Sequence, residues 1–295
     1  MKIKIGKLLP GIKKNIPLKK YTTFRIGGKA KYFLEAKTSE DLMLAISTAK
    51  KFSLPFFILG AGSNLLISDR GYRGLVIKIK NQKLNIKNKK VNVGAGVLLS
   101  TLVYESIKNS LAGIEWAVGI PGTVGGSIFG NAGAFKKSMK NIIEEVEVFD
   151  KKSGKIKIFK NQDCKFGYRE SIFKKDKNLI ILSARIKLKK SSKEKIKSEI
   201  KEYSGNRRKT QPLNLPSIGS IFKNPKNFSA AGLIEKCNLK GKRVGNVKIS
   251  EKHANFIVNL GNGKANEVKK LINSAKKAVK NKFGIILEEE IQYLP

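Results

Sequence analysis

The chain has 295 residues, and its 61 lysines and arginines against 22 aspartates and glutamates give a formal net charge of +39. Hydrophobic residues make up 41%, a fraction typical of a globular protein with a real core. One histidine, and two distant cysteines without a Cys-x-x-Cys pair, exclude a structural zinc site, so we expect no metal and reduced thiols. The first 20 residues lack an uninterrupted apolar stretch, so we expect no signal peptide and a cytoplasmic protein.

The high positive charge raises the question of nucleic-acid binding. Only eight of the 61 basic residues are arginine, and the lysines are spread along the whole chain. Proteins that recognise nucleic acids use arginine freely for bidentate and stacking contacts. We therefore attribute the lysines to codon bias on a solvated surface, and we expect no specific nucleic-acid partner.

The first third of the chain predicts alternating helix and strand. Residues 1–20 are expected to form a basic, weakly structured lead-in. The apolar spacing predicts a helix over 39–52 with Ser39 as its N-cap. Short apolar runs predict buried strands over 55–60 and 74–80.

The rest of the chain continues the mixture, with a domain boundary expected near residue 205. The expected elements are a hairpin over 84–96, a helix over 98–110, strands over 146–150, 155–159 and 179–188, a lysine-rich helix within 189–202, a helix over 265–284 and a strand over 285–294. Adjacent strand patterns without intervening helices favour an α+β fold over a doubly wound parallel sheet.

One long stretch of this basic chain carries no charge at all. It runs from Trp116 to Phe135 and contains "GIPGTVGGSIFGNAGA" at 119–134. Its length approaches that of a membrane span, but Pro121 and the glycines break helices, so we expect no membrane segment. Glycine lets the backbone approach a ligand closely, so we expect a ligand-binding loop here.

Two Gly-x-Gly turns could contact phosphate. They are "GAGSNL" at 60–65 and "GAGVLL" at 94–99, and neither is a Rossmann fingerprint because leucine replaces the third glycine. The first also offers Ser63 and Asn64 as hydrogen-bond donors for a diphosphate. Together with 119–134, this turn predicts a large phosphate-bearing cofactor held between two glycine-rich cradles.

Eight stretches occur in the order of a known family. They are "YTTFRIGG" (21–28), "LGAGSNLLISD" (59–69), "GIEWAVGIPGTVGGSIFGNAGA" (113–134), "YRESIFK" (168–174), "RRKTQP" (207–212), "PSIGSIFKNP" (216–225), "GLIEKCNLKGKRVGNVKISEKHANFIVN" (232–259) and "LEEEI" (287–291). This set resembles the UDP-N-acetylenolpyruvoylglucosamine reductases (UDP-N-acetylmuramate dehydrogenases). The resemblance covers roughly residues 18–292.

The resemblance implies an FAD-binding fold of the vanillyl-alcohol-oxidase (PCMH) type followed by a smaller α+β substrate-binding domain. We expect the FAD-binding domain over 21–190, with subdomains of about 21–80 and 81–190, and the second domain over 205–295. The implied reaction reduces UDP-N-acetyl-enolpyruvoylglucosamine to UDP-N-acetylmuramate for peptidoglycan, with hydride passing from flavin to C3 and a proton to C2. NADPH is the implied hydride source, although the sequence does not distinguish it from NADH, and we expect a monomer.

The resemblance also implies which residues hold non-covalent FAD. They lie in the two glycine-rich stretches. The cofactor-binding candidates are Gly60, Ala61, Gly62, Ser63, Asn64, Leu65, Gly119, Pro121, Gly122, Gly125, Gly126, Ser127, Asn131 and Ala132.

Arg169, Ser220 and Glu290 fall on the family's catalytic positions. A guanidinium suits an enolate because it is planar, always charged and bidentate, and a serine hydroxyl can deliver a proton to C2. Hydride addition at C3 leaves negative charge that spreads into the substrate carboxylate, and a glutamic acid can share a hydrogen bond with the oxygens of that carboxylate. Within "EEE", strand alternation places Glu288 and Glu290 on one face, so Glu288 is the second choice and Glu289 an unlikely one.

The implied substrate-binding residues are Tyr168, Lys209, Lys223, Asn224 and His253. The chain departs from the family at "AFKKSMK" (134–140), where a glycine-rich continuation is usual, so we expect a local difference there. It also lacks the tyrosine-bearing insertion of one branch of the family.

The alternatives to this function are another FAD oxidoreductase of the same cofactor fold and, less favoured, a basic nucleic-acid-binding protein.

Overall fold

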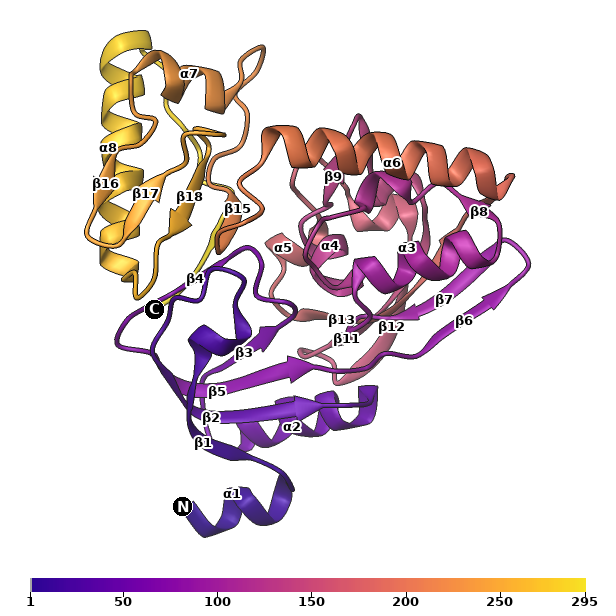
Figure 1. Ribbon diagram of the computed structural model, residues 1–295. Helices are drawn as coiled ribbons and strands as arrows, with labels where there is room; N and C mark the ends of the chain where they lie inside the picture. Colours follow the sequence, from indigo (N-terminus) through magenta and orange to yellow (C-terminus); the bar gives the residue numbers. More distant parts are fainter. Residues whose placement is uncertain (1) are drawn as a thin grey trace. The chain divides into compact units, whose positions relative to one another are not determined.

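A computed structural model describes the backbone of residues 2–295 and the side chains from residue 5 onward (Figure 1). The chain forms two compact units. The first comprises Met1–Ile12, Phe33–Ala61 and Leu75–Asn206, and the second Lys13–Tyr32, Gly62–Gly74 and Arg207–Pro295. The chain therefore passes between the units several times, unlike the contiguous domains expected from the sequence.

An antiparallel five-stranded sheet is the centre of the first unit. Its order is β12 (Lys155–Lys160), β11 (Ile143–Asp150), β13 (Leu179–Lys187), β7 (Lys90–Gly94) and β6 (Leu84–Lys87). Alternation along β11 buries Val146 and Val148 on one face and directs Glu145 and Glu147 to the other. On the polar face Glu145 pairs with Arg185 of β13 at 3.0 Å.

Helices cover the apolar face of this sheet, where α4 (Val124–Phe129) packs on β13 and β7 (Figure 1). The other elements near it are α3 (Leu99–Lys108), α5 (Ile172–Lys175), α6 (Lys193–Thr210), the paired strands β8 (Leu111–Ala112) and β14 (Lys189–Lys190), the hairpin of β9 (Gly133–Ala134) and β10 (Lys137–Ser138), and the 3-10 turns Glu115–Ala117, Met139–Asn141 and Asn161–Cys164.

A second sheet has β5 (Tyr72–Ile79) between β2 (Lys29–Ala36) and the parallel β3 (Phe56–Leu59). The helix α2 (Ser39–Lys51) precedes β3, as the sequence predicts, but its N-cap is Thr38 and not Ser39. The Thr38 hydroxyl accepts a hydrogen bond from the Asp41 amide, and the Asp41 carboxylate accepts one from the Thr38 amide, each at 3.1 Å.

The N-terminal lead-in is more ordered than expected. It contains α1 (Lys2–Leu8), β1 (Lys13–Pro17), which neighbours β2, and the 3-10 turn Leu18–Tyr21. Ile5, Leu9 and Leu18 are buried. Burial of these side chains explains why this basic segment is folded.

The second unit is built on a four-stranded antiparallel sheet in the order β15 (Ser217–Ser220), β18 (Phe256–Asn259), β17 (Val247–Ile249) and β16 (Arg243–Val244). Its core also takes in apolar residues of α7 (Ala230–Lys236) and α8 (Ala265–Phe283). The periodic apolar side chains of α8, such as Leu271 and Val279, are fully buried, which is why the sequence predicts this helix well.

The C-terminal strand differs from the prediction. Only β19 (Gln292–Leu294) is a strand, paired in parallel with β4 (Leu65–Ile67). Residues 288–290 lie beside 221–223, with an isolated antiparallel bridge between Phe222 and Glu289. The amide of Glu290 donates to the carbonyl of Ile221 at 2.8 Å. Because β4 pairs with β19, residues 62–74 belong to the second unit and not to a domain over 21–190.

Asp69, which follows β4, caps α8 from a distant part of the sequence. Its two carboxylate oxygens accept hydrogen bonds from the amides of Ala265 (2.9 Å) and Asn266 (3.2 Å).

We expect Asp69→Ala to lower the free energy of unfolding by about 1–2 kcal/mol, because it removes a charged cap from a helix N-terminus. Urea denaturation followed by circular dichroism measures this loss. The control is the exposed Glu202→Ala, and equal losses in both variants would contradict the capping role.

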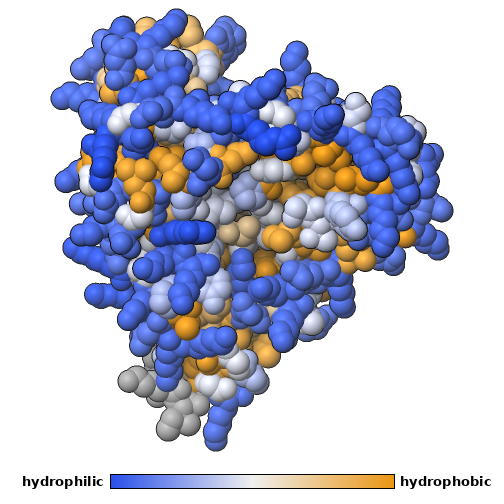
Figure 2. All heavy atoms as spheres, in the orientation of Figure 1, coloured by the Kyte–Doolittle hydropathy of each residue, from blue (hydrophilic) through white to orange (hydrophobic). Residues whose placement is uncertain are grey.

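Hydrophilic side chains cover most of the face shown in Figure 2, in keeping with the net charge of +39. Among the described residues, we find no helix with the length and apolar character needed to cross a bilayer. The uncharged stretch from Trp116 to Phe135 is folded into short elements of the first unit.

Candidate active site

The first cradle is the turn over residues 60–65 that follows β3. Both of its glycines are required by the chain's own packing. A β-carbon on Gly62, whose φ is +67°, would lie 2.2 Å from the carbonyl oxygen of Tyr21, and one on Gly60 would lie 2.7 Å from Thr123 Oγ1. Asn64 is exposed, and its amide nitrogen donates to the carbonyl of Glu290 at 3.1 Å. The glycine pattern therefore has a structural cause in addition to any ligand.

Lys78 is a candidate residue that the sequence analysis missed. It lies on β5 opposite Leu59, and its ammonium group donates a hydrogen bond to the carbonyl of Gly60. Burial, helped by the nearby Lys80, lowers the pKa of Lys78 to about 8. A lysine that interrupts the apolar run over 74–79, in the strand pattern that follows the Gly-x-Gly turn, was the signal available in the sequence.

The second cradle, residues 119–134, is not a plain loop as expected, because it contains the helix α4. Thr123 caps this helix by accepting a hydrogen bond from the Gly126 amide at 3.3 Å. Gly125 packs tightly, since a β-carbon there would lie 2.8 Å from Ala95 Cβ. Gly126 and Gly130 are different: the nearest atoms to an added β-carbon lie 3.4 and 3.8 Å away. A β-carbon on either residue would make only ordinary van der Waals contact, so packing does not require these two glycines.

Arg169 lies at the tip of a tight turn in the same unit. The amide of Gly167 donates a hydrogen bond to the carbonyl of Glu170 at 3.0 Å, and the amide of Glu170 donates one to the carbonyl of Gly167 at 3.3 Å. Arg169 has a φ of +57°, a conformation that costs energy for any residue with a β-carbon. Its guanidinium donates from Nη2 to the carbonyl of Gly133 at 2.9 Å and lies 5.3 Å from the ring centre of the exposed Tyr168.

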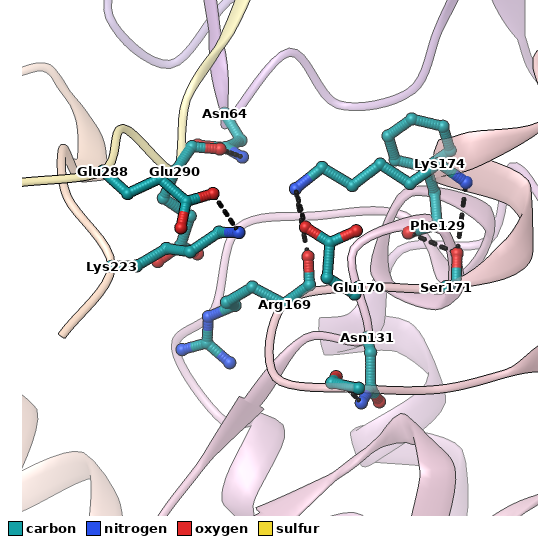
Figure 3. A network of polar contacts seen from close by, with 11 residues as sticks. Asn64, Phe129, Asn131, Arg169, Glu170, Ser171, Lys174, Lys223, Glu288 and Glu290 are labelled. Carbon is teal, nitrogen blue, oxygen red and sulfur yellow. Dashed lines mark hydrogen bonds and ion pairs between the residues drawn. The ribbon is translucent and has the colours of Figure 1, made fainter. Parts of the chain in front are cut away.

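Buried polar contacts fix the backbone of this turn (Figure 3). The Asn131 amide nitrogen donates to the carbonyl of Gly167 at 2.7 Å, and the fully buried Ser171 hydroxyl donates to that of Phe129 at 2.7 Å. Lys174 donates to the carbonyl of Arg169 at 3.0 Å. Asn131 therefore supports the Arg169 turn, whatever contact it makes with a cofactor.

Ser220 ends β15 in the second unit. It pairs with Phe256 of β18, and the register of the two strands shifts between Ser217 and Ser220. The preceding Gly219 has a φ of +81°, and no atom lies within 4 Å of a β-carbon built there. The half-buried Ser220 therefore follows a stretch of backbone that a ligand can approach closely.

The three consecutive glutamates differ in their surroundings. Glu288 forms an ion pair with the buried ammonium of Lys223, with 2.6 Å between Oε1 and Nζ (Figure 3). Glu289 contacts Lys276 of α8 at 2.9 Å and the hydroxyl of Tyr293. The half-buried Glu290 has its amide bonded to Ile221, which ties it to the strand end that carries Ser220. Glu288 and Glu289 thus contact different partners.

The remaining predicted substrate residues are also in the second unit. Asn224 is exposed, and its side-chain oxygen accepts from the Ala230 amide at 3.0 Å, while Lys209 is exposed on α6. His253 Nδ1 accepts from the Asn255 amide at 3.3 Å, and burial lowers the pKa of His253. Among the described residues, no group of three or more His, Cys, Asp or Glu side chains could bind a metal ion.

The predicted site residues form two sets, each assembled within one unit. The first unit brings Tyr168 and Arg169 together with the second cradle and also carries Gly60 and Ala61. The second unit brings Ser220, Lys223, Asn224 and Glu290 together with residues 62–65 and also carries Lys209 and His253.

Family models match both parts of the chain. An FAD binding domain matches residues 30–160, and the C-terminal domain of UDP-N-acetylenolpyruvoylglucosamine reductase matches residues 211–294. A relative named UDP-N-acetylenolpyruvoylglucosamine reductase from Caldicellulosiruptor bescii is 42% identical over 95% of this chain and 90% of its own length. The chain belongs to this reductase family. Another relative of that name, from Caldanaerobacter subterraneus, is 42% identical over 94% of this chain and 92% of its own length.

A solved structure agrees with the sequence relatives. The crystal structure of UDP-N-acetylenolpyruvylglucosamine reductase from Thermus caldophilus is 36% identical and superposes with a TM-score of 0.82, covering 96% of this chain and 98% of that one. The expected α+β fold, with an FAD-binding domain and a C-terminal domain of this family, is confirmed. The chain is thus an FAD-dependent oxidoreductase.

The residues present fit FAD. The second cradle has no charged side chain from Trp116 to Phe135, and its Gly126 and Gly130 are not required by packing, as expected of glycines that let a ligand approach the backbone. The first cradle has Ser63, the exposed Asn64 and the cationic Lys78 at its base, which suit a diphosphate.

Proposed function

We propose that this chain reduces the enolpyruvyl group of UDP-N-acetyl-enolpyruvoylglucosamine to give UDP-N-acetylmuramate, using NADPH, for peptidoglycan synthesis in the cytoplasm. The main support is the agreement with relatives of that name over 95% of the chain. The residue types at the predicted catalytic positions match the chemistry of an enolpyruvyl ether, which needs its carboxylate held and a proton delivered to C2.

FAD, when bound, supplies the hydride that is added at C3 of the substrate. The two cradles would hold it non-covalently, with Ser63, Asn64 and the backbone of the second cradle as hydrogen-bonding groups. Lys78 would add a positive charge near the diphosphate through its position beside Gly60. Gly126 and Gly130, which packing does not require, would keep side chains away from the cofactor.

Arg169 would stabilise the negative charge that spreads into the substrate carboxylate after addition at C3. One of its nitrogens is already held by the Gly133 carbonyl, so the guanidinium has a fixed direction before substrate binds. Preorganised donors of this kind are usually the largest single contribution to catalysis. Tyr168 lies beside the guanidinium and would contact the substrate there.

Ser220 would donate a proton to C2, and Glu290 would share a hydrogen bond with the oxygens that Arg169 holds. Glu288, whose carboxylate is in an ion pair with Lys223, is the second choice for that role. Lys223, Asn224, Lys209 and His253 would bind the UDP-sugar. We propose a monomer that contains all of these groups.

The protein is expected to purify yellow, with about one FAD per chain released by acid. Neither cradle contains a histidine or cysteine, so no side chain there can anchor the flavin covalently. Acid precipitation followed by absorbance of the supernatant measures the release. Flavin that stays with the precipitated polypeptide would contradict non-covalent binding.

The decisive test of the reaction is visible absorbance. NADPH should bleach the bound flavin, and the enolpyruvyl-UDP-sugar should then restore its colour. Bleaching without recovery on adding this substrate would favour another FAD oxidoreductase of the same fold. A colourless protein whose affinity for nucleic acid collapses in salt would favour the nucleic-acid alternative.

A further inference from the structure

The hairpin between β9 and β10 has an unusual sequence at its tip. Ala134 pairs with Lys137 and Gly133 with Ser138, which leaves Phe135 and Lys136 as a two-residue turn. Both have positive φ, at 51° and 60°. Such turns are normally filled by Asn-Gly because a β-carbon is strained at positive φ. Phe135 and Lys136 therefore need stabilisation from elsewhere in the fold.

Two side chains of α6 provide contacts to this hairpin. The ring of Tyr203 stacks on that of Phe135, with 4.3 Å between centroids and 19° between planes. Glu199 pairs with Lys137 at 3.3 Å, and the Lys137 ammonium also lies 5.9 Å from the Tyr203 ring centre. Glu199 and Tyr203 are four residues apart and so share one face of the helix. We call these two residues the α6 clamp.

The hairpin in turn directs Arg169. The Gly133 carbonyl accepts the hydrogen bond from Arg169 Nη2 at 2.9 Å. Gly133 packs directly on the opposite strand, since a β-carbon there would lie 2.6 Å from the carbonyl oxygen of Lys137. A change in the hairpin therefore moves the oxygen atom that fixes the direction of the guanidinium.

We propose that Glu199 and Tyr203 are positioning residues for the reaction, because they hold the strained Phe135-Lys136 turn and thereby aim the Arg169 guanidinium. This inference rests on the proposed role of Arg169 at the substrate carboxylate. The α6 clamp acts through Gly133 and contacts none of the reacting groups itself.

The first experiment compares Tyr203→Ala with Tyr203→Phe in the FAD-loaded enzyme. We expect the alanine variant to slow flavin reoxidation by the enolpyruvyl-UDP-sugar by about 10- to 100-fold, because a misaimed catalytic group loses rate on this scale. FAD affinity and reduction by NADPH should stay within about twofold of wild type, since only the aim of Arg169 changes. Tyr203→Phe retains the stacked ring and should reoxidise normally, as should Tyr104→Ala, a control at an exposed tyrosine on α3.

The second experiment tests whether the clamp acts by holding a strained turn. Glycine adopts positive φ freely, so Lys136→Gly should relieve the need for Tyr203. We expect Tyr203→Ala combined with Lys136→Gly to regain most of the lost reoxidation rate. A ring that merely supported the fold of α6 would not be replaced by a glycine in the hairpin. Absence of rescue, or a Tyr203→Phe variant as slow as Tyr203→Ala, would overturn the proposal.

Hydrogen exchange separates failure of the clamp from failure of the proposed function. In Tyr203→Ala we expect faster amide exchange in both 132–139 and 167–170, because Gly133 connects the two segments. Faster exchange in both with a wild-type reoxidation rate would support the clamp and contradict the catalytic role of Arg169. Unchanged exchange in the two segments would contradict the clamp whatever the rate.

Discussion

Arg169→Lys is expected to slow the reaction of the reduced enzyme with its enolpyruvyl substrate by roughly 30- to 1,000-fold, a loss of about 2–4 kcal/mol in transition-state stabilisation. Lysine keeps the charge but cannot hold a carboxylate through two parallel hydrogen bonds. It also lacks the second nitrogen that binds the Gly133 carbonyl while another binds the substrate. Both residues have a β-carbon, so the strain at φ +57° is the same in the two proteins.

Single-turnover absorbance measures this effect in protein with a full complement of FAD. Arg185→Lys is the matched control, because Arg185 pairs with Glu145 on the polar face of the large sheet and has no assigned role in the site. We expect that variant to react at the wild-type rate. Near-wild-type turnover of Arg169→Lys would show that another residue binds the substrate carboxylate.

The sequence was most informative where one periodic pattern decides the structure. The helices over 39–52, 98–110 and 265–284 are found within two residues of their predicted ends, because each buries a regular apolar face. The strand predicted over 285–294 is shorter, because its partner β4 lies more than 200 residues away and pairs with only three residues. No local pattern reveals that pairing, nor the resulting division of the chain.

Local sequence patterns were also insufficient to describe the candidate site. Sequence motifs selected Arg169, Ser220 and the glycine-rich stretches, but they could not tell a glycine that faces a ligand from one required by packing. Gly62 and Gly125 are required by packing, whereas a β-carbon on Gly126 would make only an ordinary van der Waals contact. The departure at 134–140 led us to expect a local difference, but the two positive φ angles there and the stacking of Tyr203 on Phe135 depend on contacts that only the fold creates.

Ser220→Ala is expected to separate the two half-reactions. Reduction of FAD by NADPH requires no proton from Ser220, so bleaching should proceed at the wild-type rate. Reoxidation by substrate leaves an enolate that must be protonated at C2, and the loss of a positioned acid costs about 10²–10⁴-fold. The variant should therefore bind FAD, bleach normally and recover its colour slowly. Stopped-flow absorbance resolves both steps.

Ser217→Ala is the matched control for this experiment, because it removes a hydroxyl from the same strand three residues earlier. The carbonyl of Ser217 accepts a hydrogen bond from Thr23 at 2.7 Å, a contact that alanine retains. We expect this control to complete both steps normally. Wild-type reoxidation by Ser220→Ala, under conditions where chemistry limits the rate, would show that Ser220 is not the proton donor. Slower bleaching would instead mean that Ser220 shapes the flavin pocket, and the match of "PSIGSIFKNP" to the catalytic motif would then be wrong.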